Sequence, residues 1–454
     1  MTLTRHFIGL TAFGLALAAS ASAHALTLEQ AIAETLQNNP GILSQAHETE
    51  SRKEELRQAR SGYYPSLDLA AGIGYEDSYN VNTRDPDTGE WEWKDYTRKE
   101  AALLLRQMLF DGRATTSEVE RQEARIASAD WRLKALGEYT SLRVAEVYLE
   151  LLTRQEMLRL SQENLKTHER TYDQVKLRSE SGVGRMADLA QVEGRVARAR
   201  ANVISDENNL ADALANYRRV VGSVPADALN EPSGTDASLP VTMETALQQA
   251  QDNHPTLRSA EADVDAGFAQ YEATKHRFVP RLDLELGRTW GEDLDGVEGR
   301  NEDMTAMLRL RWNLFNGWRD DARKRQTAHL INEAKSIRDN TRREVDESLA
   351  LSWNAYKALD SQIPYLKQHV DSSLETRDAY DKQFGLGKRT LLDLLDSENE
   401  LFQARRAHTE ARNKRLFAQY RILAGIGALM PTLQVGVPTV EPLPDDLDTL
   451  TQTR

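Results

Sequence analysis

LRQMLFDG at Leu105–Gly112 returns as LRWNLFNG at Leu310–Gly317, 205 residues later, and the rest of the 454-residue chain is arranged around these two copies. Further motif pairs return in the same order, at offsets between 203 and 215 residues. Ordered matches at a nearly constant offset indicate an internal repeat. We therefore expect two structural repeats, at residues 24–222 and 242–430, joined by a linker at 223–241 that is rich in proline, alanine, serine and aspartate.

Before each copy, the sequence alternates between apolar and polar residues. In the second repeat Leu282, Leu284 and Leu286 share one side of the expected strand, and Asp283 and Glu285 share the other. A period of two over about ten residues, with charges on one face, is typical of membrane barrel strands, although a half-buried hairpin of a water-soluble domain has the same period. Five of the seven tryptophans lie in or beside these segments, as an aromatic girdle requires. We expect strands at about residues 65–79, 97–110, 280–290 and 304–315.

Long helical stretches follow each copy. Residues 113–179 and 318–383 carry apolar residues spaced by three and four, as in a coiled-coil seam. A helix over 113–179 would be roughly 100 Å long. Glycine-containing turns end both stretches, and return helices are expected at 187–221 and 389–424. One long helix can then lie beside two shorter helices stacked in line, and Pro364 should kink the second long helix.

The two ends of the chain differ from the repeats. Residues 1–23 contain a basic residue, an apolar stretch and small residues at 21–23, the arrangement of a secretory signal peptide; an N-terminal membrane anchor is the alternative. Residues 431–454 combine four prolines with acidic residues. We expect this segment to be a disordered tail.

The composition excludes several classes of protein. The net charge of −14 disfavours nucleic-acid binding, and the absence of cysteine rules out disulfides, thiolate metal sites and an acylated N-terminal cysteine. The nine histidines show no metal-ligand spacing, and the chain has neither a phosphate-binding loop nor a GxSxG turn. We therefore expect no enzyme activity, no cofactor and no metal. The acidic segment 291–303 indicates an exposed loop rather than a Ca²⁺ site.

Four strands per chain cannot close a barrel, because about eight is the smallest number that spans a membrane. Open strand edges are not tolerated in lipid. If these strands lie in a bilayer, the chain must oligomerise, and three copies supply twelve strands. The expected fold is therefore mainly helical with a small β part, a pore continued by a helical tube about 100 Å long.

The chain from Thr27 to about Val435 resembles the TolC family of outer-membrane efflux and secretion channels. The tandem repeat, the two copies described above and GKRTLLDLLD at Gly387–Asp396 carry the resemblance. It implies a homotrimer with a twelve-stranded barrel in the outer membrane of a Gram-negative bacterium and a twelve-helix tunnel extending into the periplasm. It also implies docking to a periplasmic adaptor and to an inner-membrane ABC exporter or proton-driven pump.

The same resemblance assigns a gate to the helix turns at the periplasmic end. Asp393 and Asp396 fall on acidic rings that narrow the entrance, and rings of carboxylates favour cations. Arg389 and Asp188 fall on positions whose link between helices holds the tunnel shut. The turn glycines, expected at the tips that meet the adaptor, are Gly182, Gly184, Gly385 and Gly387.

Two positions depart from the family pattern at this lock. Phe384 stands where a tyrosine hydroxyl would help, and Ala187 where a threonine would, so the closed state should rest on fewer hydrogen bonds. The first turn, at 181–188, is similar to type I secretion members that export large adhesins. We therefore expect an exit duct for a type I secretion system, with the outer-membrane part of a multidrug efflux pump as the alternative. A periplasmic coiled-coil adaptor is the alternative from another class.

Overall fold

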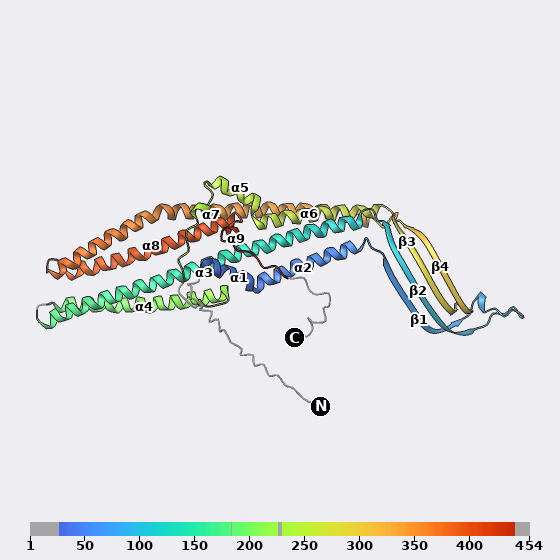
Figure 1. The fold of residues 1–454 in the computed structure, drawn as a ribbon, viewed down its shortest axis with the longest axis horizontal. Helices are drawn as coiled ribbons and strands as arrows, with labels where there is room; N and C mark the ends of the chain where they lie inside the picture. Colours follow the sequence, from blue (N-terminus) through green and yellow to red (C-terminus); the bar gives the residue numbers. More distant parts are fainter. Residues whose placement is uncertain (1–26, 183, 226–228, 441–454) are drawn as a thin grey trace, which may run out of the picture.

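The structure is a computed structural model that describes residues 27–182, 184–225 and 229–440. The molecule is elongated, with long helices over most of its length and a four-stranded sheet beyond one end of them (Figure 1). The prediction of a mainly helical chain with a small β part is confirmed. The expected signal peptide at 1–23 lies outside the described residues, as do residues 441–454 of the expected tail.

The helices of the two repeats follow the same order. Each repeat has a short helix, a longer helix, a very long helix and a return helix. In the first repeat these are α1 Leu28–Asn38, α2 Pro40–Ser61, α3 Ala114–Glu180 and α4 Met186–Val221. In the second they are α5 Met243–Asn253, α6 Pro255–Lys275, α7 Arg319–Gly385 and α8 Leu391–Gly425. The short elements are α9 Leu429–Thr432 and the 3-10 turns η1 Val81–Thr83, η2 Asp236–Ser238 and η3 His276–Phe278.

Proline divides the helical segment at the start of each repeat into two helices. Asn39 has an extended backbone with ψ of 120°, and its side-chain oxygen accepts a hydrogen bond from the Gly41 amide at 2.9 Å. His254 and Pro255 repeat this break between α5 and α6. A residue before proline is driven out of the helical conformation, whereas proline itself suits the first turn of a helix. Two shorter helices therefore run along each repeat instead of one.

The sheet has the order β1-β2-β3-β4, and every neighbouring pair is antiparallel. Its strands are β1 Ser66–Ser78, β2 Lys94–Phe110, β3 Arg281–Leu294 and β4 Val297–Arg311. The pairing of β2 with β3 joins the hairpins of the two repeats into one sheet.

The hairpin between β3 and β4 differs from the expectation of an exposed loop at 291–303. Leu294 pairs with Val297, and Asp295 and Gly296 between them have φ of 53° and 80°. A two-residue Asp-Gly turn with both φ values positive is the favoured connection of a tight hairpin. Most of the acidic segment is therefore strand. The last strand starts and ends earlier than the expected 304–315, which leaves Trp312 and Leu314 beyond it.

The pairing register separates the sheet into two faces. Leu67, Leu105, Leu286 and Ala306 are cross-strand partners in one row, and Ser66, Arg106, Glu285 and Met307 are partners in the next. Successive residues of a strand point to opposite faces, so these two rows belong to opposite faces. On the apolar face, Leu69 is 72% exposed and Leu308 is 67% exposed. On the polar face, Asp283 is fully buried beneath the guanidinium groups of Arg281 and Arg311.

Both strand-to-helix junctions use the same backbone turn. Gly112 and Arg113 have φ of 65° and 71°, and Gly317 and Trp318 have φ of 69° and 64°. At Gly112 a Cβ atom would lie 2.0 Å from Cγ2 of Val279, so glycine is needed there for space as well as for conformation. The strand is thereby turned directly into the long helix that follows it.

The main core lies midway along α3 and α7, where the ends of the shorter helices meet them. On α7 the buried residues Val345, Leu349, Ser352 and Tyr356 keep the predicted spacing of three and four, and the helix continues through Pro364. On α3 the predicted seam is buried at Val144, Tyr148 and Leu151. Beyond Leu151 the predicted positions Gln155, Leu158 and Leu165 are only half-buried and Gln162 is exposed, whereas Met157 and Leu160 are among the buried residues. The line of burial shifts because this part of α3 packs against both α4 and α8.

Part of the linker and part of the expected tail are packed against the helices. In the linker, Leu229 is buried, and Asp236 accepts hydrogen bonds from Tyr356 and Arg415 at 2.9 and 2.7 Å. In the C-terminal segment, Leu433 is buried, and Val435, Val437 and Val440 pack against the core. The expectation of disorder from 431 onward is therefore wrong for residues 431–440, whose apolar side chains pack on an apolar surface of the helices.

Candidate functional site

The two helix turns farthest from the sheet form the tips of the molecule (Figure 1). Gly182 and Gly387 each follow a long helix with φ of 78° and 74°, and their amides donate to the carbonyls of Ser179 and Phe384 at 3.1 and 3.0 Å. This left-handed cap favours glycine and satisfies carbonyls at the end of a helix. At Gly184 glycine is needed for lack of space, since an added Cβ atom would lie 2.8 Å from the Ser179 nitrogen.

Gly385 has a different environment from the other turn glycines. It is the last residue of α7, and no atom lies within 4 Å of where its Cβ atom would be. Neither strain nor crowding explains glycine there. The same open space surrounds Gly182 and Gly387, so the backbone of the tips is accessible at these three glycines.

Asp393 caps the first turn of α8. Its carboxylate accepts hydrogen bonds from the hydroxyl and the amide of Thr390 at 2.8 and 3.3 Å, and its own amide donates to the Thr390 hydroxyl at 3.2 Å. This reciprocal pair is a capping box. The Thr390 hydroxyl, followed by the Thr390 amide, holds the pKa of the Asp393 carboxyl below its ordinary value. Asp393 therefore stays ionised and held at the start of α8.

Arg389 contacts its own turn. Its guanidinium lies 4.2 Å from the ring centre of Tyr380, Nε donates to Gln383 at 2.9 Å, and Nη1 lies 3.8 Å from Oδ2 of Asp393. Within the described part of one chain, Arg389 makes no ion pair with Asp188, which lies in the first turn of α4. The structure of one chain thus brings Arg389 to Asp393 and does not form the predicted link to Asp188.

Asp396 has a partner that sequence reasoning missed. Nη2 of Arg195 on α4 lies 2.8 Å from Oδ1 of Asp396 on α8. The side chain of Arg195 is 24% exposed, whereas that of Asp396 is 60% exposed. The pair ties one helical hairpin to the other, and it places a positive charge beside the second acidic position. No local pattern predicts it, because the two residues are 201 positions apart.

An apolar cluster beside these charges holds the two hairpins together. Phe384 is 8% exposed, packs against Val175 and Val192 of the first hairpin, and has the Arg178 guanidinium 4.9 Å from its ring centre. Leu391, Leu394 and Leu395 complete the cluster from α8. The position where a tyrosine hydroxyl was expected to help the lock is therefore filled by apolar packing. The three- and four-residue spacing of the leucines was the signal for this buried face.

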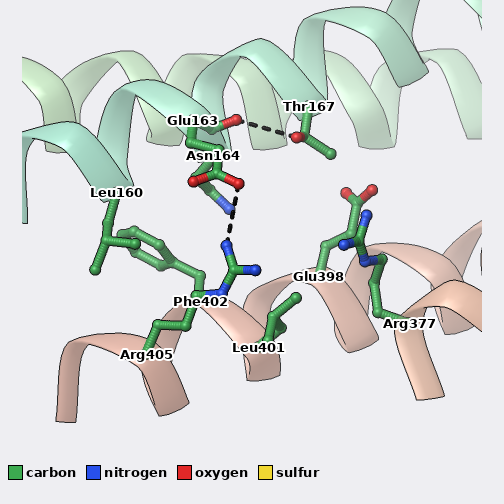
Figure 2. A pocket seen from close by; sticks show the side chains of 9 residues that line it. All are labelled: Leu160, Glu163, Asn164, Thr167, Arg377, Glu398, Leu401, Phe402 and Arg405. Atoms are coloured by element: carbon green, nitrogen blue, oxygen red, sulfur yellow. Dashed lines mark hydrogen bonds and ion pairs between the residues drawn. The ribbon is translucent and has the colours of Figure 1, made fainter. Parts of the chain in front are cut away.

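Further along the helices, on the side of the tips toward the sheet, α3 and α8 face each other across a small pocket (Figure 2). Its volume is about 50 Å³, far below the roughly 300–1,000 Å³ of ordinary ligand sites. Arg405 donates to Glu163 across it at 3.0 Å, and the buried Glu398 lies 3.3 Å from Nδ1 of the buried His168. The hydrogen bond from Arg405 to Glu163 joins α8 to α3, and the pocket offers no room for a substrate.

The described residues offer little basis for other chemistry. In the ranges that the structure describes, no group of three or more histidine, aspartate or glutamate side chains could hold a metal ion. None of the helices in those ranges combines the length and the apolar character needed to cross a bilayer. The tips therefore remain the best candidate site.

The sequence matches the family described as outer membrane efflux protein over residues 31–223 and 246–428. It is 24% identical to the outer membrane efflux protein BepC of Brucella suis, over 92% of this chain and 89% of that protein. It is 26% identical to the proteases secretion protein PrtF of Dickeya chrysanthemi, over 90% of this chain and 89% of that protein. The crystal structure of CusC has the same fold, with a TM-score of 0.75 at 17% identity, covering 88% of this chain and 92% of that chain.

Proposed function

The chain belongs to the outer membrane efflux protein family, and from this premise we propose that three copies of it form the exit duct of a type I secretion system. Members of this family are transport channels rather than enzymes. The protein is accordingly an outer-membrane protein that extends into the periplasm. The family match covers both repeats, which excludes the alternative of a periplasmic adaptor.

The proposal of a trimer rests on the structure of the sheet. It has an apolar face, a polar face and two edge strands, β1 and β4, whose outer edges have no partner strand among the described residues. Unpaired backbone groups cost several kcal/mol each in lipid, so the edge of β4 needs β1 of another copy. Three copies supply twelve strands and place the polar faces around a common lumen, with the apolar faces toward lipid.

Analytical ultracentrifugation in detergent tests this assembly. We expect a trimer that needs detergent for extraction, and a monomer or dimer would overturn the proposal. Washing membranes with carbonate or urea is a second measurement, since a barrel stays in the membrane fraction whereas a peripheral protein is released.

We propose that the tips of the three copies converge to form the gate. Asp393 and Asp396 would then form two rings, and each ring would have a cation beside it, because Arg389 and Arg195 accompany the acids in every copy. These four side chains carry no net charge per chain. The closed entrance would therefore carry less negative charge than two rings of aspartates without neighbouring cations. The link from Arg389 to Asp188 would form between neighbouring copies.

We also propose that the turn glycines are where the adaptor docks. The open space at Gly182, Gly385 and Gly387 supports this, because a partner can approach the backbone there. Gly385→Arg is the sharpest test, since the backbone of Gly385 does not require glycine. It should reduce co-purification of the adaptor while trimers still form. Gly194→Arg, at an equally open position within α4, is the control.

The more specific part of the proposal is that the channel serves protein secretion rather than drug efflux. The relative PrtF is a proteases secretion protein, which supports an ABC exporter and adaptor as partners, whereas BepC, an efflux protein, supports the proton-driven alternative. Deleting the gene should remove one or more large proteins from the culture medium and leave drug tolerance unchanged. An intact set of secreted proteins with lost drug tolerance would favour the efflux pump.

A further inference from the structure

The apolar face of the sheet ends in a group of charged side chains around one tryptophan. This group lies toward the hairpin end of the sheet, away from the helices (Figure 1). We call it the hairpin-end patch, and its members are Lys99, Arg288, Trp290, Glu292, Arg300 and Glu302.

The register places the hairpin-end patch on the lipid side of the proposed barrel. Lys99, Glu292 and Arg300 are cross-strand partners in one row, and Trp290 and Glu302 are partners two residues along. Steps of two residues keep to one face, so these rows share the face of Leu286 and Leu308. None of these side chains faces the proposed lumen.

The patch lies at the upper edge of the apolar face. Leu310 and Arg300 are ten residues apart on β4. Ten residues of strand extend about 33 Å, which at a tilt of about 40° gives a height of about 25 Å. A height of about 25 Å is also that of the apolar band on membrane barrels. If Leu310 lies at the lower edge of the band, Arg300 lies among the headgroups of the outer leaflet.

The conformation of Arg288 agrees with this boundary. Its backbone lies one row further into the apolar face, where its cross-strand partners are Leu103 and Met304. Its guanidinium reaches toward the hairpin end, 5.0 Å from the ring centre of Trp290 and with Nη2 3.3 Å from Glu302. A cation that extends from an apolar surface toward a polar layer is snorkelling, as expected at a membrane interface.

The cations of the patch have unused hydrogen-bonding capacity. Among the residues that the structure describes, Lys99, Arg288 and Arg300 share two carboxylates, at distances of 3.3 to 3.4 Å. On the polar face of the same sheet, Arg309 and Arg311 lie 2.5 and 2.6 Å from their carboxylate partners. Charge-assisted hydrogen bonds are normally shorter than about 2.9 Å. The outward pairs are thus loose, and the Arg300 side chain is 78% exposed.

We propose that the hairpin-end patch binds the phosphorylated saccharide headgroup of an outer-leaflet glycolipid. Lys99, Arg288 and Arg300 bind its phosphate groups, and the ring of Trp290 lies against a sugar. The inference rests on the proposed function only in requiring the sheet to lie in the outer membrane. Guanidinium groups suit phosphate because their planar donors can bind two oxygens at once.

Lipid retention by the purified trimer tests the proposal. The full-length protein is reconstituted in nanodiscs of phosphatidylethanolamine with equal amounts of lipid A and phosphatidylglycerol, and the lipids retained after exchange into detergent are measured by mass spectrometry. The variant Lys99→Gln/Arg288→Gln/Arg300→Gln should retain much less lipid A, with roughly a fivefold loss of affinity for each cation removed. Addition of inorganic phosphate should not displace lipid A from the unchanged protein.

The control variant is Lys53→Gln/Arg57→Gln/Arg325→Gln, which removes three exposed, ion-paired cations from the helices. It should retain lipid A as the unchanged protein does. Unchanged lipid A retention in the patch variant, or an equal loss of lipid A and phosphatidylglycerol, would overturn the glycolipid assignment. Conductance in planar bilayers distinguishes the two failures: a channel that forms but shows no lipid A preference refutes only this inference, whereas no channel refutes the proposed function.

Discussion

The guanidinium of Arg195 on α4 lies 2.8 Å from the carboxylate of Asp396 on α8, so one of the two predicted gate acids is paired inside its own chain. The other acid, Asp393, is held by Thr390 and lies near Arg389. The entrance of the proposed channel thus combines carboxylates with cations. Its ion selectivity therefore depends on how many of these carboxylates lack a cationic partner.

Removing Arg195 should make the entrance more acidic. Arg195→Ala frees Asp396, and the ring of three free carboxylates should increase cation selectivity and strengthen block by trivalent cations. Reversal potentials in a salt gradient across planar bilayers measure this. The control is Arg200→Ala: Arg200 lies on the same helix as Arg195, and its ion pair with Glu169 of α3 is more exposed, so its loss should leave selectivity unchanged. Asp393→Ala/Asp396→Ala should lower selectivity, and no change in that variant would place both acids on the outer surface.

Arg389 should stabilise the closed state. Arg389→Ser should raise single-channel conductance if the guanidinium also binds Asp188 of a neighbouring copy, because that link then opens. Lys388→Ser, at the adjacent residue, should have little effect. A double-mutant cycle with Asp188→Asn identifies the partner: effects of the two changes that simply add would show that Arg389 acts only within its own turn.

The two faces of the sheet should differ in their tolerance of charge. Leu308→Arg places a cation on the apolar face and should cost roughly 2–4 kcal/mol at mid-membrane, whereas Thr305→Arg on the polar face should be accepted. Trimer yield after refolding into detergent, measured by gel mobility, compares them. Equal loss of trimer in both variants would mean that the faces are assigned the wrong way round.

Glu138 should make the packing of the C-terminal segment depend on pH. Burial raises the pKa of its carboxyl from 4.5 to about 7, although the amides of Met430 and Leu429 donate to it at 3.2 Å. Between pH 4.5 and 7 the folded chain therefore binds more protons than the unfolded chain. This contribution to stability is fully present below pH 4.5 and is lost as the pH rises to 7, a change of about 3 kcal/mol.

Thermal unfolding followed by circular dichroism at pH 5 and pH 8 measures this effect. Glu138→Gln, which stays uncharged, should remove most of the pH dependence and melt higher than the unchanged protein at pH 8. The control is Glu146→Gln, which changes an exposed, ion-paired carboxylate on the same helix. This variant should keep the pH dependence of the unchanged protein. Parallel profiles for all three proteins would contradict the assignment.

Two neighbouring arginines on α8 should differ in their effect on stability. Arg406 donates to Asp206 at 2.7 Å, and the Asp206 side chain is 5% exposed, whereas Arg405 pairs with the half-exposed Glu163. Burial alone would raise the pKa of Asp206, but hydrogen bonds from Arg406 and Ser161 outweigh it and lower the pKa. Arg406→Ala leaves a buried charge and should cost roughly 3–5 kcal/mol.

Arg405→Ala should cost about 1 kcal/mol or less, because an exposed ion pair contributes little. Denaturant midpoints of the two variants give the comparison, and Arg406→Met/Asp206→Leu should recover much of the loss by removing both charges. A similar cost for Arg405→Ala and Arg406→Ala would show that the Asp206 site is not sealed from water.

The sequence alone was enough to determine the features that depend on local geometry. The alternation of Leu282, Asp283 and Leu284 assigns strand faces because successive residues of a strand point in opposite directions. Gly182 and Gly387 mark helix ends because few other residues adopt the left-handed cap. The repeat of LRQMLFDG as LRWNLFNG predicted that both halves would have the same order of elements.

Only the tertiary structure decided which residues from different elements meet. The Arg195–Asp396 pair, the contact of Phe384 with Val175 and the burial of Asp206 depend on the rotation and the axial offset of one long helix against another. A shift of one residue along a helix turns a side chain by about 100°, and no local pattern specifies that shift between segments 200 residues apart. The packing of residues 431–440 was missed for the same reason, since the surface that receives them is built by distant parts of the chain.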